Sequence, residues 1–450
     1  MSRYILPSSE SQRCLDRFSL LDEAEEDADG LCSLWRLIEN VLDQPVHSSS
    51  DLSDVLSTIS HLVRGSDGAA GDYGTLKGVV ESIGESFYTQ TWPQIRRCAL
   101  DMPKVFANSS LDILEPGKRL RLSREQAASL VAHQFLCTLA APSWRAEYYD
   151  FSIWYDSNQR HPVAAEIYIT TVLTYFRDMS QLDGAVVLEY SLHALPVDFS
   201  SEQFLDAPLS PLTVTSVPQF TTELEELAFQ QSSGAVVVSA NKDIGFGQSA
   251  TQEELFVGNC PEACPAVLVT PTLKPDQVLV VEGAAPMLRI TGQRRDISWT
   301  PLPPEDRRGG RLLFMDALEI DELDADDGIL VDLKPFSVDR ELQKAYTAFS
   351  SWLQQSNSTV WTGLWGCGAF NGDPTVKMII LWMAASMAGR NLCIVCDASQ
   401  EDFAQQFDEF AKSTKGGTVS DLQSILNSIP KTTERLHTLE HILSSQQASE

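Results

Sequence analysis

The second part of the chain alternates short β-branched runs with segments of helical periodicity, and this alternation limits the possible folds. After Gly184 the β-branched runs are "AVVLEYSL", "PLTVTSV", "GAVVVSA", "PAVLVT", "VLVVEGA", "RLLFMDAL" and "NLCIVCDAS". Helical patterns lie between them at 252–257, 338–355 and 374–388. Continuous apolar runs are typical of strands that are buried on both faces. We therefore predict an α/β fold in which a mixed or parallel sheet lies between helices.

The region before Gly184 has a different pattern, because its apolar residues recur at helical spacing. Ser123 and Gln126 have the spacing of a capping box at the start of one helix. The tail after Ser420 is again helical and polar. We predict five early helices, at 34–43, 52–65, 75–100, 123–140 and 163–179. We also predict three parts: a helical region at 1–182, an α/β domain at 183–412 and a helical tail at 413–450.

Charge and cysteine usage limit the partners and the compartment. The net charge is −29, so the surface repels polyanions on average, and we expect no direct DNA binding. The longest apolar stretch, 376–389, carries Lys377 and predicts a buried helix, so we expect no membrane partner. The first residues lack the apolar core of a signal peptide, and the nine cysteines form no disulfide framework. These features together predict an intracellular protein.

The stretch "DIGFGQSATQEEL" (243–255) directly follows the strand run "GAVVVSA". It would lie at the carboxyl end of a strand, which is where α/β sheets bind ligands. Gly245 and Gly247 allow the backbone to approach a diphosphate closely. Two adjacent carboxylates, Glu253 and Glu254, suit acid chemistry on a glycosidic bond.

A structural interpretation of the same residues competes with the catalytic one. Thr251 and Glu254 have the capping-box spacing, and acids in a first helical turn offset the helix dipole. A Glu254 side chain that folds back onto the cap is expected not to reach a ligand. From this stretch alone, both interpretations remain open.

Several motifs, in the same order along the chain, resemble those of the poly(ADP-ribose) glycohydrolase family. The first is the glycine loop followed by Gln252, Glu253 and Glu254, with Asn241 upstream. The others are "LSREQAASLVAHQFLCTLAAPSW", "FMDAL", "ELQKAYTAF" and "WGCGAFNGD", which together span roughly 120–400. The resemblance implies a three-layer α/β/α macrodomain that binds ADP-ribose and is preceded by a helical accessory region.

The resemblance also implies roles for individual residues. Glu254 would be the general acid and base, while Glu253 and Asn241 would hold hydroxyl groups of the reacting ribose. Two loops would wrap the diphosphate, and Phe370 would position the distal ribose. The remaining residues expected to bind substrate are Gly245, Phe246, Gly247, Gln252, Gly366, Cys367, Gly368 and Ala369. No metal and no cofactor is needed, because proton transfer handles the leaving group.

The chain departs from the family pattern at three places. Phe246 stands where the family usually has a middle glycine, and only "QSAT" separates the loop from Gln252. Val238 stands where the animal enzymes have an Asp. The segment that corresponds to their tyrosine-rich stretch, "EGAAPMLRITGQRRD", has no tyrosine. Its Arg294 and Arg295 belong to an arginine-rich strip (289–311), which is either a phosphate guide or an exposed loop.

We therefore expect a glycohydrolase that cuts ribose–ribose bonds of poly(ADP-ribose) and releases ADP-ribose. The expected partners are poly(ADP-ribose) or ADP-ribose-modified proteins, and we expect a monomer in the nucleus, the cytoplasm or both. Two alternatives remain: a reader that binds ADP-ribose without cutting it, and an unrelated zinc hydrolase. Zinc ligands are suggested by "HTLEH" (437–441) and by the pairs Cys260/Cys264 and Cys393/Cys396. However, Cys393 and Cys396 are three apart on a predicted strand, so they should point to opposite faces.

Overall fold

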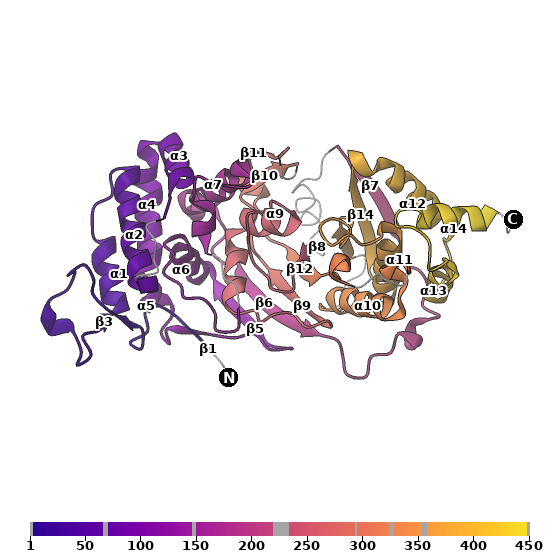
Figure 1. Cartoon of the computed structure of the whole chain (residues 1–450), viewed down its shortest axis with the longest axis horizontal. Coiled ribbons are helices and arrows are strands. Elements are labelled where there is room, and N and C mark those ends of the chain that lie inside the picture. Colours follow the sequence, from indigo (N-terminus) through magenta and orange to yellow (C-terminus); the bar gives the residue numbers. More distant parts are fainter. Residues whose placement is uncertain are drawn as a thin grey trace.

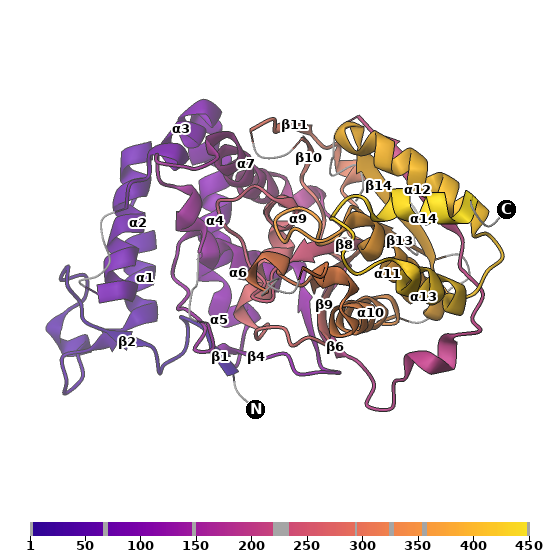
Figure 2. The ribbon, with the colours of Figure 1, turned by 45° about the vertical axis from the view of Figure 1, so that its right-hand side comes forward.

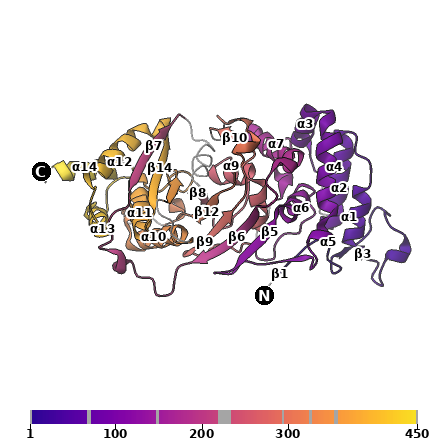
Figure 3. The same cartoon turned by 180° about the vertical axis from the view of Figure 1, so that it is seen from behind.

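The computed structural model describes residues 3–65, 71–145, 150–218, 234–292, 295–323, 328–352 and 358–447. Helices of the N-terminal region gather at one end of the molecule, and the C-terminal helices lie at the other end (Figures 1 and 3). The N-terminal helices are α1 (Leu34–Leu42), α2 (Ser49–Arg64), α3 (Gly74–Ile83), α4 (Trp92–Leu100), α5 (Met102–Val105), α6 (Arg124–Phe135) and α7 (Pro162–Asp178). The capping box that we predicted for α6 is present, with Ser123 and Gln126 exchanging hydrogen bonds.

An eight-stranded mixed sheet lies at the centre of the molecule, which confirms the predicted fold class. Its strands are β5 (Arg119–Ser123), β6 (Val187–Ala194), β7 (Leu212–Val217), β8 (Ala235–Ala240), β9 (Gln277–Glu282), β12 (Arg311–Asp316), β13 (Thr359–Thr362) and β14 (Asn391–Asp397). Their order across the sheet is β5-β6-β9-β12-β8-β13-β14-β7. The neighbours β12, β8, β13, β14 and β7 are parallel to one another. Their carboxyl ends therefore meet at one edge of the sheet.

Three further strand pairings lie outside the central sheet. The short strands β1 (Arg3–Ile5) and β4 (Ser110–Asp112) pair antiparallel, as do β2 (Arg13–Cys14) and β3 (Cys32–Ser33). A hairpin is formed by β10 (Leu288–Thr291) and β11 (Ser298–Pro301). Strand β5 belongs to the predicted accessory region, yet it pairs with β6 and so extends the central sheet. The boundary that we predicted at residue 182 stays a prediction.

Each face of the sheet has its own hydrophobic core, as expected for strands that are covered on both sides. Val236 and Val238 contribute to one core with α6, α7 and α9 (Gln252–Asn259). Val237 contributes to the other core, which also contains side chains of α10 (Pro335–Phe349), α11 (Pro374–Met387), α12 (Glu401–Ser413), α13 (Val419–Ser428) and α14 (Thr438–Gln447). Figure 2 shows α11, α12, α13 and α14 gathered beside β14. The arrangement is a macrodomain-type sheet between helical layers.

The interior of α11 confirms one sequence interpretation directly. All of its side chains from Pro374 to Met387 are buried, including Lys377. Lys377 is compensated by ion pairs with Glu341 and Asp332. No helix among the described residues is both long and apolar enough to cross a membrane.

Three secondary-structure predictions were wrong or incomplete. The run "PAVLVT" is not a strand, because Pro261–Leu268 forms a buried 3-10 helix and Pro265 cannot donate to a ladder. The predicted helix 75–100 is interrupted between α3 and α4 by a segment that includes Phe87–Thr91 in a π-helix. Strands β5 and β13 were missed, because both are short and carry few apolar residues.

A buried ion pair fastens the helical region to the sheet domain. The guanidinium of Arg124 donates to both carboxylate oxygens of Glu262, at 2.6 and 2.7 Å, and both side chains are buried. Tyr175 and Tyr190 also donate to Glu262, to its carboxylate and its carbonyl respectively. Burial raises the pKa of Glu262, and the neighbouring Arg124 opposes this shift. Arg124 belongs to α6 and Glu262 to the 3-10 helix that follows α9, so the pair joins two distant segments.

We expect Glu262→Gln to lower the free energy of unfolding by about 3–5 kcal/mol, because it leaves the buried Arg124 guanidinium without a countercharge. Urea unfolding measures this loss. Glu166→Gln is the matched control, since Glu166 is exposed on α7 and should change stability by less than about 0.5 kcal/mol. Equal stability of both variants would contradict the structural role of the pair.

Candidate functional site

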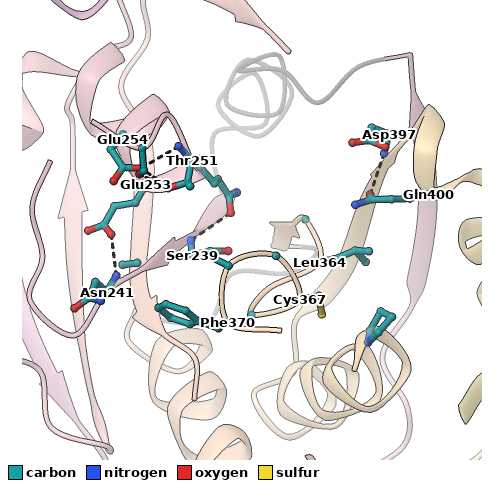
Figure 4. Close-up of a pocket in the computed structure, with 18 of the residues that line it drawn as sticks. Ser239, Asn241, Thr251, Glu253, Glu254, Leu364, Cys367, Phe370, Asp397 and Gln400 are labelled. Carbon is teal, nitrogen blue, oxygen red and sulfur yellow. Dashed lines mark hydrogen bonds between the residues drawn. The ribbon is translucent and has the colours of Figure 1, made fainter. Parts of the chain in front are cut away.

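A cavity of about 450 Å³ lies at the carboxyl edge of the parallel strands. Its lining comes from the end of β8 (239–241), from the start of α9, from the loop after β13 (363–370) and from the residues after β14. Neighbouring parallel strands that end together leave a crevice, and α/β proteins bind ligands in such crevices. Figure 4 shows the side chains of this cavity on facing walls.

Most of the predicted site residues line this one cavity. They are Asn241, Gln252, Glu253, Glu254, Gly366, Cys367, Gly368, Ala369 and Phe370. The two motifs that supply them are more than a hundred residues apart in the sequence, and the sheet brings them together. Gly245, Phe246 and Gly247 are not part of the lining; they form the loop that leads from β8 towards α9.

The capping box at the start of α9 is present. The backbone N–H of Thr251 donates to Oε2 of Glu254 at 3.0 Å, and the Thr251 hydroxyl contacts the same oxygen. Glu254 nevertheless lines the cavity and is only half-buried. A Cβ atom added to Gly247 would lie 3.4 Å from the other carboxyl oxygen of Glu254, Oε1. Glu254 therefore combines a capping role with a place in the cavity lining, and the expectation that a capping Glu254 does not reach a ligand stays a prediction.

Glu253 is buried and holds the glycine loop in place. Its Oε2 accepts a hydrogen bond from the backbone N–H of Asn241 at 2.8 Å, and its Oε1 accepts one from Gly245 at 3.1 Å (Figure 4 draws the first). Burial raises the pKa of Glu253 well above its ordinary value, and the neighbouring Glu254 raises it further. The two backbone donors oppose this shift only in part.

The glycine loop is also held from the helical region. The Phe246 ring is buried and lies 5.2 Å from the rings of Phe151 and Trp154, measured between ring centroids. The indole N–H of Trp154 donates to the carbonyl of Gly247 at 3.0 Å. Arg145 donates to the carbonyl of Ile244. The residue that replaces the usual middle glycine is therefore an anchor for the loop, and the aromatic run "FSIWY" (151–155) was the sequence signal for it.

The second loop, Gly366–Phe370, requires a glycine at its start. Gly366 has φ +74°, and a Cβ there would lie 2.5 Å from the Cβ of Ala317. Burial raises the pKa of the Cys367 thiol, and its Sγ donates to the carbonyl of Trp365 at 3.4 Å. A thiol with a raised pKa is a poor nucleophile at neutral pH. Cys367 is therefore a loop residue of the cavity wall.

Gln252 connects α9 to the strand that precedes it. Its side-chain carbonyl accepts from the Ser239 backbone N–H at 3.4 Å, and its amide donates to the Val237 carbonyl at 3.3 Å. These bonds give Gln252 a positioning role at the edge of the cavity. The lining also contains residues that sequence reasoning missed, among them Asp397, Gln400, Arg435 and Leu436.

The structure does not bring the suggested zinc ligands together. Among the described residues, no group of three or more His, Cys, Asp or Glu side chains is placed to hold a metal. Cys393 and Cys396 belong to different cores, on opposite faces of the sheet, as their spacing predicted. His437 is exposed and lies 3.6 Å from Glu434.

Two described arginines of the arginine-rich strip, Arg307 and Arg311, serve packing. Arg307 is buried and pairs with Asp178 at 2.8 Å. Arg311 pairs with Glu282 at 2.8 Å and stacks over Trp352. Neither residue lines the cavity, and Arg294 lies outside the described residues.

Comparison with known proteins gives two family models that together cover well over half of the chain. Residues 80–190 match "Poly (ADP-ribose) glycohydrolase (PARG), helical domain", and residues 207–404 match "Poly (ADP-ribose) glycohydrolase (PARG), Macro domain fold". Poly(ADP-ribose) glycohydrolase 1 of Caenorhabditis elegans is 26% identical over 372 residues, which are 78% of this chain and 45% of that protein.

A second relative and a solved structure carry the same family name. Poly(ADP-ribose) glycohydrolase 2 of Caenorhabditis elegans is 27% identical over 208 residues, which are 42% of this chain and 43% of that protein. The chain thus spans about half the length of the curated relatives it matches. A mutant poly(ADP-ribose) glycohydrolase from Deinococcus radiodurans in complex with ADP-ribose is 15% identical, with a TM-score of 0.35, and the match covers 50% of this chain and 94% of that one.

The raised pKa of Glu253 predicts a pH dependence of stability. An unfolded glutamic acid titrates near about pH 4.3. Because folding raises the pKa of Glu253, the folded state keeps the Glu253 proton up to a higher pH than the unfolded state does. The contribution of this group to the free energy of unfolding is therefore complete below about pH 4.3 and is lost as the pH rises through the folded pKa. Glu253→Gln cannot titrate, so the wild type should lose stability relative to this variant as the pH rises above about 4.3.

Denaturant unfolding at several pH values measures this difference. Glu85→Gln is the matched control, because Glu85 is exposed in the helical region and its curve should run parallel to that of the wild type. Parallel curves for wild type and Glu253→Gln would show that Glu253 titrates as it does in the unfolded chain.

Proposed function

Because the chain belongs to the poly(ADP-ribose) glycohydrolase family, we propose that it hydrolyses ribose–ribose O-glycosidic bonds of poly(ADP-ribose) and releases ADP-ribose. One observation carries the proposal within this chain. Two adjacent glutamates face a cavity at the carboxyl edge of the sheet, and two glycine-containing loops flank that cavity. This is the arrangement that acid and base chemistry on a bound glycoside requires.

Glu254 is the proposed general acid and base. In its acid form it donates a proton to the departing ribose oxygen while the glycosidic C–O bond breaks. The resulting carboxylate then takes a proton from a water molecule, whose oxygen bonds to the oxocarbenium-like carbon. The proton therefore returns to Glu254, and the products are one ADP-ribose and a polymer shortened by one unit. In this series of steps, proton transfer alone stabilises the leaving group.

Glu253 and Asn241 are the proposed partners of the reacting ribose. Each carboxylate oxygen of Glu253 accepts one backbone N–H, and a carboxylate oxygen has two lone pairs, so each can still accept a ribose hydroxyl. The side-chain oxygen of Asn241 accepts from the Asp243 backbone N–H at 3.0 Å, which directs its amide group. The amide can then donate to a ribose oxygen.

The two loops are the proposed cradle of the diphosphate. Backbone N–H groups in glycine-containing loops bind anions well, because no Cβ blocks the approach. In this proposal Gly366–Phe370 contributes the wall opposite Glu254, and Phe370 positions the distal ribose. Gly245 and Gly247 support the cradle from the loop that Phe246 anchors.

A reader of ADP-ribose without hydrolytic activity is the second candidate. The capping box formed by Thr251 and Glu254 supports it, because that bond gives Glu254 a structural role in the absence of chemistry. The same cavity and loops would serve a reader equally well, so turnover separates the two candidates.

Release of free ADP-ribose from poly(ADP-ribose), measured with EDTA present, tests the proposal. We expect rapid release by the wild type and a loss of at least about 10³-fold in Glu254→Gln, since general acid and base catalysis contribute factors of about 10² to 10⁴ each. A capping box accepts Gln in place of Glu, so this variant keeps the cap and removes only the acid.

Glu440→Gln is the matched control, because it removes an exposed acid from the first turn of α14 and should leave release unchanged. ADP-ribose binding without release by the wild type would favour the reader. Full release of ADP-ribose by Glu254→Gln would mean that another residue is the general acid.

A further inference from the structure

A segment near the C-terminus reaches the cavity from outside the matched family region. Arg435 and Leu436 line the cavity, whereas the macrodomain family model ends its match at residue 404. The segment leads into α14, which packs beside α11 and α12 (Figure 2). Sequence reasoning assigned this tail no role in the site.

The segment is fastened to both ends of the Gly366–Phe370 loop. Arg435 donates through Nε to the carbonyl of Gly372 at 3.1 Å and through Nη2 to the carbonyl of Cys367 at 3.0 Å. The Leu436 backbone N–H and the Thr438 hydroxyl donate to Asp373, at 3.1 and 2.8 Å. Asp373 is buried and also caps α11, so it fixes the segment to a rigid element.

Charge distinguishes Arg435 from the rest of the cavity wall. The described residues that line the cavity include three acids, Glu253, Glu254 and Asp397, and their only Lys or Arg is Arg435. The whole chain has a net charge of −29. A diphosphate that entered this cavity would therefore meet acidic side chains, and it needs a local cation to offset them.

We propose that Arg435 contacts the diphosphate of the bound ADP-ribose unit and is a ligand-binding residue of this site. The inference rests on the proposed function, because it assigns the anion that the cavity binds. Guanidinium groups carry five N–H donors in a planar fork, and two of them donate to the loop carbonyls. The other N–H groups of Arg435 can donate to phosphate oxygens. The carbonyl of Cys367 accepts a hydrogen bond from Arg435, so this carbonyl is directed to the guanidinium and not to the anion.

Calorimetric binding of ADP-ribose and of ADP tests this inference without requiring turnover. We expect Arg435→Gln to weaken both ligands about 10- to 100-fold, as loss of a charged hydrogen bond predicts. Arg435→Lys keeps the charge and should lose less affinity. Added salt should weaken the wild type more than Arg435→Gln, because screening acts on the charge that the variant lacks.

Arg308→Gln is the charge-matched control, because Arg308 is exposed, lies outside the cavity and should bind both ligands as the wild type does. Unchanged affinity in Arg435→Gln would overturn the inference even if ADP-ribose release is intact. If Arg435→Gln and Arg435→Lys lose equal affinity and both keep the salt dependence of the wild type, the inference is overturned, because Arg435 then only supports the loop. If the wild type binds neither ligand and releases no ADP-ribose, the proposed function fails as well.

Discussion

The geometry of the cavity depends on one buried carboxylate. Glu253 lies in the first turn of α9 and accepts backbone hydrogen bonds from Asn241 and Gly245. These two bonds set the path of the chain where it leaves β8, an interior strand of the sheet. The next residue, Glu254, lines the cavity. Burial of an acid costs free energy, and at this position that cost is offset only in part by backbone donors.

The two loops of the cavity are held by segments that lie outside the sheet. Phe151 and Trp154 from the helical region enclose Phe246 and bind the first loop. Arg435 and Thr438 from the C-terminal segment bind the second loop and the start of α11. A loop whose ends are fixed loses less conformational freedom when a ligand binds, which favours affinity. The accessory region and the tail thus contribute to the site through rigidity.

Features that follow a local pattern of residue types could be predicted from the sequence alone. Alternating β-branched and helical segments predicted the sheet between helices, and the spacing of Thr251 and Glu254 predicted the cap. Short segments were not predictable in this way, because "PAVLVT" and the four residues of β13 obtain their conformation from tertiary packing. Arg435 was missed for a related reason, since no local pattern shows which distant loop a polar segment will contact.

The cap on Glu254 supports a structural role, and it is also compatible with catalysis. The hydrogen bonds from Thr251 engage one carboxyl oxygen, Oε2, and leave the other, Oε1, to accept or carry a proton. A side chain held by a cap has already lost its rotamer freedom, so substrate binding does not have to order it again. Catalytic groups need such pre-organisation within a few tenths of an ångström. In this chain the same bond can therefore stabilise the helix and orient the side chain of the proposed acid.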